Sequence, residues 1–259
     1  MNSHNCTIIA HRGESYDAPE NTLASINLAW ERNADAVEID VQLTKDNKIV
    51  VIHDKNTKRT TGRSKSVKSQ TLNELRELDA GLFKDKRWRD EKIPVLSEVL
   101  KTVPVGKKII IEIKCGLEII NFLKEEISNS GLSADQIEII GFDISVVAKA
   151  KQALPDYKVL WLHELDYTII GKVFHPSVDT LIEKGKENNL DGLDLWAGKF
   201  ITKEFVQKIK SNGLLLYVWT VNDPETALEL YNQGIYGITT DRPVWLKDRI
   251  LKKIEKRES

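Results

Sequence analysis

Eight short runs rich in β-branched residues recur along the chain, and most alternate with segments whose apolar residues are spaced three and four apart. Strands that alternate with helices indicate a parallel sheet, and eight such units predict a closed (β/α)₈ barrel, the TIM-barrel fold. A length of 259 residues is normal for one such barrel, so we expect a single domain over residues 1–259. The runs are 7–10, 36–42, 109–114, 137–142, 158–163, 192–196, 214–221 and 237–240.

A ninth run, residues 49–53, follows the second run too closely to be a parallel unit. Parallel neighbours need a crossover of a dozen or more residues, so this run is expected to return antiparallel as a β-hairpin. The turn residues 45–48 favour a register in which paired residue numbers sum to about 93, which sets His53 beside Asp40. The polar stretch that follows, about residues 54–92, predicts a small helical insertion above the barrel.

The charge balance argues against several classes of partner. The chain has 38 basic and 39 acidic residues, so no basic excess points to nucleic acid.

No apolar run of about eighteen residues is present, which predicts no transmembrane segment. No signal peptide is visible, so we expect a cytoplasmic protein, although a secreted protein trimmed of its signal would look the same. Cys6 and Cys115 lie in strand-like runs and are expected to be reduced thiols.

Residues able to do chemistry occupy the ends of the first three barrel strands. Catalytic groups of this fold gather at the carboxyl ends of the strands, so these side chains are expected to share one site. They are His11, Arg12, Glu38, Asp40, Glu112 and Lys114, and the hairpin adds His53.

The residue types in this group suit the hydrolysis of a phosphodiester. The three carboxylates offer the hard oxygen ligands that Ca²⁺, Mg²⁺ or Mn²⁺ prefer. Arginine and lysine are able to bind an anion, and two histidines are able to act as base and acid near neutral pH. A cation, an anion clamp and a histidine pair together neutralise a phosphodiester and move its protons.

Each residue also has a simpler interpretation. Glu112 and Lys114 would form a surface ion pair worth under about 1 kcal/mol, or Lys114 would be a Schiff-base lysine. Trp219 is equally well a wall for substrate carbons or part of the upper core, and Trp196 is assigned to the core. Asn21 is interpreted as a helix cap.

Motifs along nearly the whole chain, about residues 8–246, resemble the glycerophosphodiester phosphodiesterase family. Near the amino end they read Ala10-His11-Arg12-Gly13, Pro19-Glu20-Asn21-Thr22, Val37-Glu38-Ile39-Asp40-Val41, Thr44-Lys45-Asp46, Val51-Ile52-His53-Asp54 and Arg59-Thr60-Thr61-Gly62. Further along they read Ile93-Pro94-Val95-Leu96, Ile111-Glu112-Ile113-Lys114, Val218-Trp219-Thr220-Val221-Asn222 and Thr239-Thr240-Asp241-Arg242-Pro243. The middle, residues 141–196, resembles the family least.

The resemblance implies a small-molecule substrate, a glycerophosphodiester, that is hydrolysed to sn-glycerol 3-phosphate and an alcohol in glycerol and lipid metabolism. It implies one divalent cation, Mg²⁺ or Ca²⁺, on Glu38, Asp40 and Glu112. It further implies acid–base catalysis by His11 and His53, and phosphate binding by Arg12 and Lys114, positions read from the matching motifs. Two other functions stay open: a lysophospholipase D-type activity on the same scaffold, and a non-catalytic phosphate-ester binder. Asp241 and Arg242, in the last motif, are expected to pair as a loop brace.

Overall fold

Eight parallel strands close into a barrel in the computed structural model, which describes residues 6–168 and 173–258. Strand β1 pairs with β11 on one side and with β2 on the other, and the β1–β2 pairing closes the sheet into a barrel. The predicted barrel is therefore confirmed, and each predicted run lies within two residues of a strand. The barrel strands are β1 (Thr7–Ala10), β2 (Ala36–Leu43), β4 (Lys108–Ile113), β5 (Ile137–Gly141), β6 (Lys158–His163), β9 (Gly192–Trp196), β10 (Leu215–Trp219) and β11 (Gly237–Thr240).

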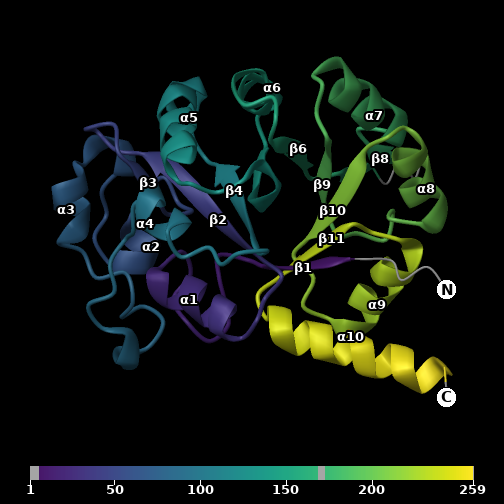
Figure 1. Ribbon diagram of the computed structural model, residues 1–259, viewed down its shortest axis with the longest axis horizontal. Coiled ribbons are helices and arrows are strands. Elements are labelled where there is room, and N and C mark those ends of the chain that lie inside the picture. Colours follow the sequence, from purple (N-terminus) through teal and green to yellow (C-terminus); the bar gives the residue numbers. More distant parts are fainter. Residues whose placement is uncertain (1–5, 169–172, 259) are drawn as a thin grey trace.

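Helices cover the outside of the barrel, and α10 runs beneath it at the end of the chain (Figure 1). Their boundaries follow ordinary capping rules: Asp223 accepts a hydrogen bond from Thr226 N, and Pro224 opens α9. Asn21 was expected to cap α1, but the cap is Thr22, whose side chain accepts from Ser25 N. The helices are α1 (Leu23–Glu31), α4 (Leu96–Leu100), α5 (Ile120–Asn129), α6 (Ile144–Ala153), α7 (Val178–Glu187), α8 (Lys203–Ser211), α9 (Pro224–Gln233) and α10 (Pro243–Glu258).

The barrel interior is narrow and layered. Apolar side chains from alternate strand positions fill its middle, and they include Ile9, Ile110, Leu160 and Tyr217. At the amino end of the strands, the buried Glu138 accepts from the Tyr217 hydroxyl at 2.6 Å and pairs with Lys108 Nζ at 2.7 Å. The amino end of the barrel interior is therefore filled by paired side chains, and the candidate site lies at the carboxyl end of the strands.

The ninth strand, β3 (Ile49–Val51), pairs antiparallel with β2 as predicted. The register differs by one residue from the expected one, because Ile52, not His53, donates its backbone N–H to Asp40 O at 2.9 Å. His53 follows directly beyond the ladder, where Gln42 Nε2 donates to its carbonyl at 2.9 Å. The imidazole still lines the same pocket as Glu38, so the hairpin brings it to the site as expected.

The insertion after β3 lies beside the hairpin (Figure 1) and has a small core of its own. Its elements are α2 (Lys58–Thr61), η1 (Val67–Ser69), α3 (Leu72–Arg76) and η2 (Lys86–Trp88). Its core packs Val67, Leu75, Leu78 and Ile93 against the hairpin residues Val50 and Ile52, among others. The predicted insertion is therefore packed against the strand that leads to His53.

The remaining elements are short. A two-stranded hairpin of β7 (Asp166–Thr168) and β8 (Val173–His175) lies after β6 and was not expected from the sequence. Two 3₁₀ helices, η3 (Leu117–Ile119) and η4 (Ala134–Gln136), precede α5 and β5. Both cysteines are free thiols. Within residues 6–168 and 173–258, no helix combines the length and apolar character that crossing a bilayer requires.

Candidate active site

The mouth of the barrel holds a pocket of about 240 Å³ that brings together nearly all the residues expected from the sequence. Asp40 lies beneath its surface, fully buried, and contacts the Arg12 side chain instead of the open space. The pocket is lined by His11, Arg12, Glu38, His53, Glu112, Lys114, Ile140, Phe142, Leu162, Glu164, Asp194, Trp219 and Thr239.

Three buried carboxylates converge on one point. Glu38 and Asp40 project from the same face of β2, and Asp40 stands opposite Glu112 in the ladder between β2 and β4. One oxygen from each lies within 4.8 Å of the others. Glu38 Oε1 and Asp40 Oδ1 are buried and have no hydrogen-bond partner. Buried oxygens that lack donors are expensive, so this cluster fits a divalent cation that would supply the missing positive charge.

In the absence of a cation, the pKa values of these three carboxyls reflect their burial and their mutual repulsion. Burial, followed by repulsion from Asp40, raises the pKa of Glu38 well above its usual value. Burial and Asp40 likewise raise the pKa of Glu112 to about 7. Burial also acts to raise the pKa of Asp40, but Arg12 and Lys114 outweigh it and the pKa falls below its ordinary value. Asp40 is therefore the carboxyl of the three that ionises most readily.

Asn21 holds Asp40 in place. Its Nδ2 donates to Asp40 Oδ2 at 2.7 Å, and its Oδ1 accepts from Asp40 N at 3.1 Å. Asn21 has a φ of 57°, a left-handed conformation that asparagine tolerates better than most residues. The residue expected to cap a helix thus holds a predicted metal ligand in place, and no sequence pattern indicated this contact.

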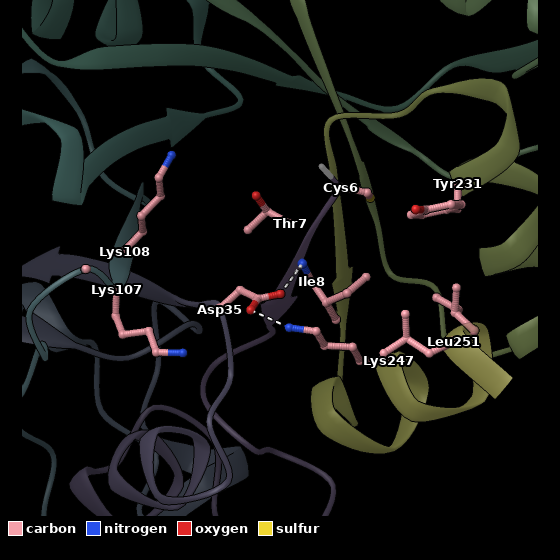
Figure 2. A pocket seen from close by; sticks show the side chains of 11 residues that line it. Cys6, Thr7, Ile8, Asp35, Lys107, Lys108, Tyr231, Lys247 and Leu251 are labelled. Carbon is pink, nitrogen blue, oxygen red and sulfur yellow. Dashed lines mark hydrogen bonds and ion pairs between the residues drawn. The ribbon is translucent and has the colours of Figure 1, made fainter. Parts of the chain in front are cut away.

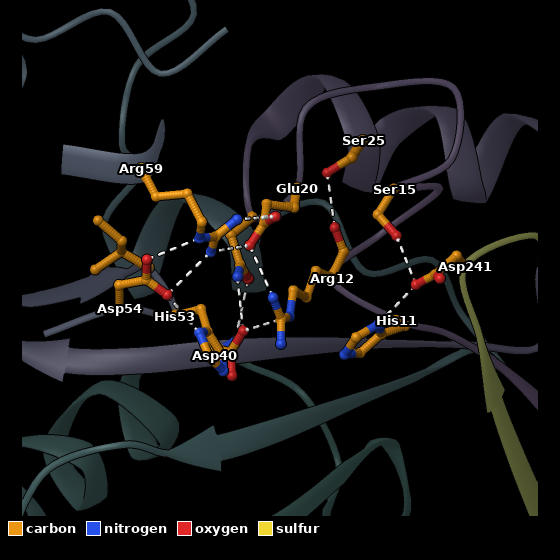
Figure 3. Close-up of polar contacts among 12 residues, drawn as sticks. His11, Arg12, Ser15, Glu20, Ser25, Asp40, His53, Asp54, Arg59 and Asp241 are labelled. Carbon is orange, nitrogen blue, oxygen red and sulfur yellow. Dashed lines mark hydrogen bonds and ion pairs between the residues drawn. The ribbon is translucent and has the colours of Figure 1, made fainter. Parts of the chain in front are cut away.

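His11 is oriented by a carboxylate from the far end of the chain (Figure 3). Its Nδ1 lies 2.7 Å from Asp241 Oδ1, which also accepts from Ser15 Oγ, while Asn222 Nδ2 donates to Oδ2 at 2.6 Å. Burial opposes ionisation of Asp241, but the bond to His11 and the other donors lower its pKa to about 2. An ionised carboxylate accepts the Nδ1 proton, which leaves Nε2 of His11 for the pocket.

The loop brace expected between Asp241 and Arg242 is not formed. Arg242 instead lies over the rings of Tyr16 and Trp245, at 3.9 and 4.2 Å from their centroids. The two residues therefore do different work, since Asp241 turns inward to the histidine and Arg242 packs on aromatic faces.

His53 is oriented in a parallel way by its neighbour in sequence (Figure 3). Its Nδ1 lies 2.7 Å from Asp54 Oδ1, and Arg59 Nε donates to Asp54 Oδ2 at 2.7 Å. The bond from Arg59 is the main cause that lowers the pKa of Asp54 to about 2. Arg59 also pairs with Glu20 at 2.6 Å, which in turn accepts from Arg12 at 2.9 Å. A chain of charge-assisted bonds thus joins His53 to Arg12.

Lys114 is inside the site and is not a surface residue. Its Nζ lies 2.7 Å from Glu112 Oε1 and 3.6 Å from Asp40 Oδ1, and 5.5 Å from the centroid of the Phe142 ring. Burial acts to lower the pKa of Lys114, but the two carboxylates raise it overall. The amine therefore stays charged, which suits an anion clamp and not a Schiff-base nucleophile.

An apolar wall stands opposite the charged groups. Trp219 contacts Phe142 edge to face, with ring centroids 5.7 Å apart, and Leu162 and Ile140 complete this side. Trp219 lines the pocket, and its Nε1 is buried without a partner. Trp196, expected in the core, is 45% exposed at the end of β9.

Asp194 is a buried acidic residue of the pocket that the sequence reasoning missed. It is 2% exposed, and its Oδ1 has no hydrogen-bond partner. Burial, then repulsion from Glu112, raises the pKa of Asp194 well above the ordinary value. A signal existed, since an acidic residue at the centre of the strand run 192–196 must face either the core or the barrel interior.

The mouth of this barrel combines groups that neutralise an anion with groups that move protons beside it, as the class of phosphodiester hydrolases requires. The comparison with known families places the chain within that class more closely. The model of the glycerophosphoryl diester phosphodiesterase family matches residues 11–244. The chain belongs to that family and is an enzyme of that activity.

Relatives support the assignment over nearly the full length. Glycerophosphodiester phosphodiesterases from Caldanaerobacter subterraneus and Bacillus subtilis are 32% and 31% identical, covering 95% and 91% of this chain and 98% and 83% of theirs. The solved structure of an Oleispira antarctica phosphodiesterase in complex with the product sn-glycerol-3-phosphate is 30% identical, with a TM-score of 0.85. The alignment with that structure covers 94% of this chain and 96% of the other.

Proposed function

We propose that the chain hydrolyses glycerophosphodiesters with the help of one divalent cation, Mg²⁺ or Ca²⁺, and with His11 and His53 as its acid–base pair. One observation carries the proposal: three buried carboxylates lie within 4.8 Å of one another, with unpartnered oxygens, beside a pocket that both histidines line. A non-catalytic binder would have no need of two histidines that are each backed by a carboxylate.

Glu38, Asp40 and Glu112 would hold the cation. Their oxygens are the hard donors that Mg²⁺ and Ca²⁺ prefer, and their burial excludes competing water. When bound, the cation would neutralise charge on the phosphodiester and favour attack at phosphorus. The clamp from Asn21 keeps Asp40 aimed at the cluster whether or not the cation is there.

Arg12 and Lys114 would bind the non-bridging phosphate oxygens. Both are positively charged residues of the pocket wall, and both touch Asp40, which fixes their side chains before substrate arrives. Fixed donors stabilise developing negative charge without reorganisation. Trp219, on the opposite wall, would pack against the glycerol carbons.

The two histidines would move the protons. The resemblance implies that the 2-hydroxyl of glycerol attacks phosphorus while one histidine accepts the hydroxyl proton. The other histidine donates a proton to the alcohol oxygen as its bond to phosphorus breaks. Water then opens the cyclic phosphate to give sn-glycerol 3-phosphate, the product bound by the Oleispira antarctica relative. Asp241 and Asp54 keep each imidazole in one tautomer throughout.

The test is the release of sn-glycerol 3-phosphate from glycerophosphocholine or glycerophosphoethanolamine, followed with Mg²⁺, with Ca²⁺ and with a chelator. We expect turnover with at least one cation and none with the chelator. His163→Ala is a matched control, because this histidine is outside the pocket and should not matter. Full activity in the chelator would contradict the metal, and full activity in His53→Ala would contradict the acid–base role.

A second activity, on acylated substrates, is favoured by the rim of the mouth. Three large apolar side chains there are exposed: Leu117 by 53%, Phe142 by 44% and Trp196 by 45%. Leu117 and Phe142 follow the ends of β4 and β5, and Trp196 is the last residue of β9. A lysophospholipase D from Homo sapiens is 25% identical to this chain. Release of choline from lysophosphatidylcholine, compared with release from glycerophosphocholine, would decide it.

A further inference from the structure

A second hollow adjoins the reaction pocket on the side of the hairpin. It has a volume of about 680 Å³, and Lys114 lines both it and the reaction pocket. We call it the outer groove, and the residues that matter to its character are Gln42, Lys45, Lys55, Lys68, Lys114 and Glu118. It lies between the β2–β3 hairpin, the start of the insertion and the loop after β4.

Two residues of the outer groove lie on the strand faces that build the reaction site. On β2, Gln42 follows Asp40 at the next position of the inward face. Beyond β4, Lys114 follows Glu112 in the same way. Gln42 Nε2 also donates to the carbonyl of His53, so the outer groove begins next to one of the two histidines. An alcohol leaving on that side of the phosphate would extend into it.

The outer groove carries an excess of positive charge. Four lysines and one glutamate line it, although the whole chain is nearly neutral. Lys68 lies 3.6 Å from Glu118, and Lys114 pairs with the site carboxylates. Lys45 and Lys55 form no ion pair with any residue in 6–168 or 173–258. Two exposed ammonium groups are therefore left to meet a ligand.

The acids next to these lysines in sequence are engaged elsewhere. Asp46 Oδ1 accepts from the Thr44 hydroxyl at 2.7 Å. Asp54 is bonded to His53 and Arg59. Neither of the two is among the residues that line the outer groove, so the positive charge is not cancelled within it.

We propose that the outer groove binds the leaving alcohol and favours alcohols that carry a negative charge of their own, a second phosphate group foremost. This rests on the proposed function, since it assumes that the phosphodiester is bound between Arg12 and Lys114. Lys45 and Lys55 then attract the distal charge, and a cationic alcohol such as choline gains nothing from them.

The test uses two substrates that differ by one phosphodiester: glycerophosphoglycerol and bis(glycerophospho)glycerol. Both release sn-glycerol 3-phosphate, but only the second leaves an alcohol that carries a further negative charge. We expect Lys45→Gln/Lys55→Gln to lower kcat/KM for the doubly charged substrate by about threefold to tenfold, the range for two exposed charges. The value for glycerophosphoglycerol should stay within about twofold, and added salt should narrow the difference between substrates.

Lys210→Gln/Lys252→Gln is the matched control, because it removes two exposed lysines from α8 and α10, outside both pockets. It should leave both values unchanged. An equal loss for the two substrates, or no loss for either, in Lys45→Gln/Lys55→Gln would overturn the outer groove as a charge-selective site. Failure of the unmutated enzyme to release sn-glycerol 3-phosphate from either substrate would instead overturn the proposed function, and this inference with it.

Discussion

The two ends of the barrel bury acidic groups in opposite ways. At the amino end, Glu138 is bonded to Tyr217 and Lys108, so that both of its oxygens have a donor. Nearby, a cavity of about 310 Å³ between β1 and α10 contains Asp35, which accepts from Ile8 N at 3.3 Å and pairs with Lys247 at 2.6 Å (Figure 2). At the amino end, each of these carboxylates is therefore paired with donors from the protein itself.

At the carboxyl end, some buried carboxylate oxygens have no donor from the protein. Glu38 Oε1 and Asp40 Oδ1 are buried without a donor, although Arg12 and Lys114 are close by. Burial of an acid therefore does not mark the functional end of this barrel, since both ends bury acids. The functional end is marked by buried carboxylate oxygens that lack a hydrogen-bond donor, because such oxygens lower stability and a purely structural acid would be paired.

The largest expected effect separates the two ends by activity. His11→Ala and His53→Ala should each lower kcat by about 10²–10⁴-fold, the range for removal of a general acid or base. Their free energy of unfolding should stay within about 1 kcal/mol, since both side chains are partly exposed. Steady-state kinetics and urea denaturation check this. A large loss of stability in either variant would mean that the mouth is also structural.

Glu138→Ala should do the reverse. It deprives Lys108 and the Tyr217 hydroxyl of a buried partner, so it should lower the free energy of unfolding by about 2–4 kcal/mol. The kcat of the folded variant should change by less than about threefold. A stable, inactive Glu138→Ala would contradict the comparison between the two ends.

Glu38→Gln, at the carboxyl end, should abolish turnover and raise the stability of the metal-free protein, because it relieves repulsion in the acidic cluster.

Asp241→Asn tests the support behind a histidine. The amide cannot favour a single tautomer of His11 as a carboxylate does, so we expect kcat to fall about 10- to 100-fold with little change in KM. Asp223→Asn is the matched control, because asparagine caps a helix as well as aspartate does. A change in KM alone would show that Asp241 acts on substrate binding instead of on His11.

The smallest effect is a pH dependence of the metal-free protein. The pKa of Glu112 is about 7 in the folded state and near its ordinary value when unfolded, so the folded state binds more protons between pH 4.5 and 7. Stability should therefore fall as pH rises through that window. We expect the melting temperature in chelator to drop by about 3 °C or more from pH 5 to pH 8. Glu112→Gln, or added Mg²⁺ or Ca²⁺, should reduce the drop, whereas a rise would contradict the assignment.

The fold and the grouping of the predicted site residues were within reach of the sequence because both follow short-range rules. Strand alternation puts Glu38 and Asp40 on one face, and the barrel rule puts Glu112 beside them. The hairpin needed only the argument that a run so close to β2 must return antiparallel. Its register was off by one residue, which the sequence could not settle because the turn sets it.

The supporting residues could not be foreseen, since they depend on loops and on distant contacts. Asp241 reaches His11 across 230 positions of sequence. Asn21 clamps Asp40 only because it and Arg12 both adopt left-handed backbone conformations. Trp196 was assigned to the core by its size, but it stands on the last position of its strand, where the barrel no longer covers it.

The small core of the insertion has a consequence for how the site comes apart. The carboxylates are carried by central barrel strands, whereas His53 follows a three-residue strand that leans on the insertion core formed around Val67, Leu75 and Ile93. A peripheral unit of this kind opens at a lower free energy than the whole molecule, so its amides should exchange with solvent sooner than those of β2 and β4. On warming, we therefore expect His53 to leave the site at a lower temperature than the three carboxylates, so that the proposed proton transfer is lost before the proposed cation site.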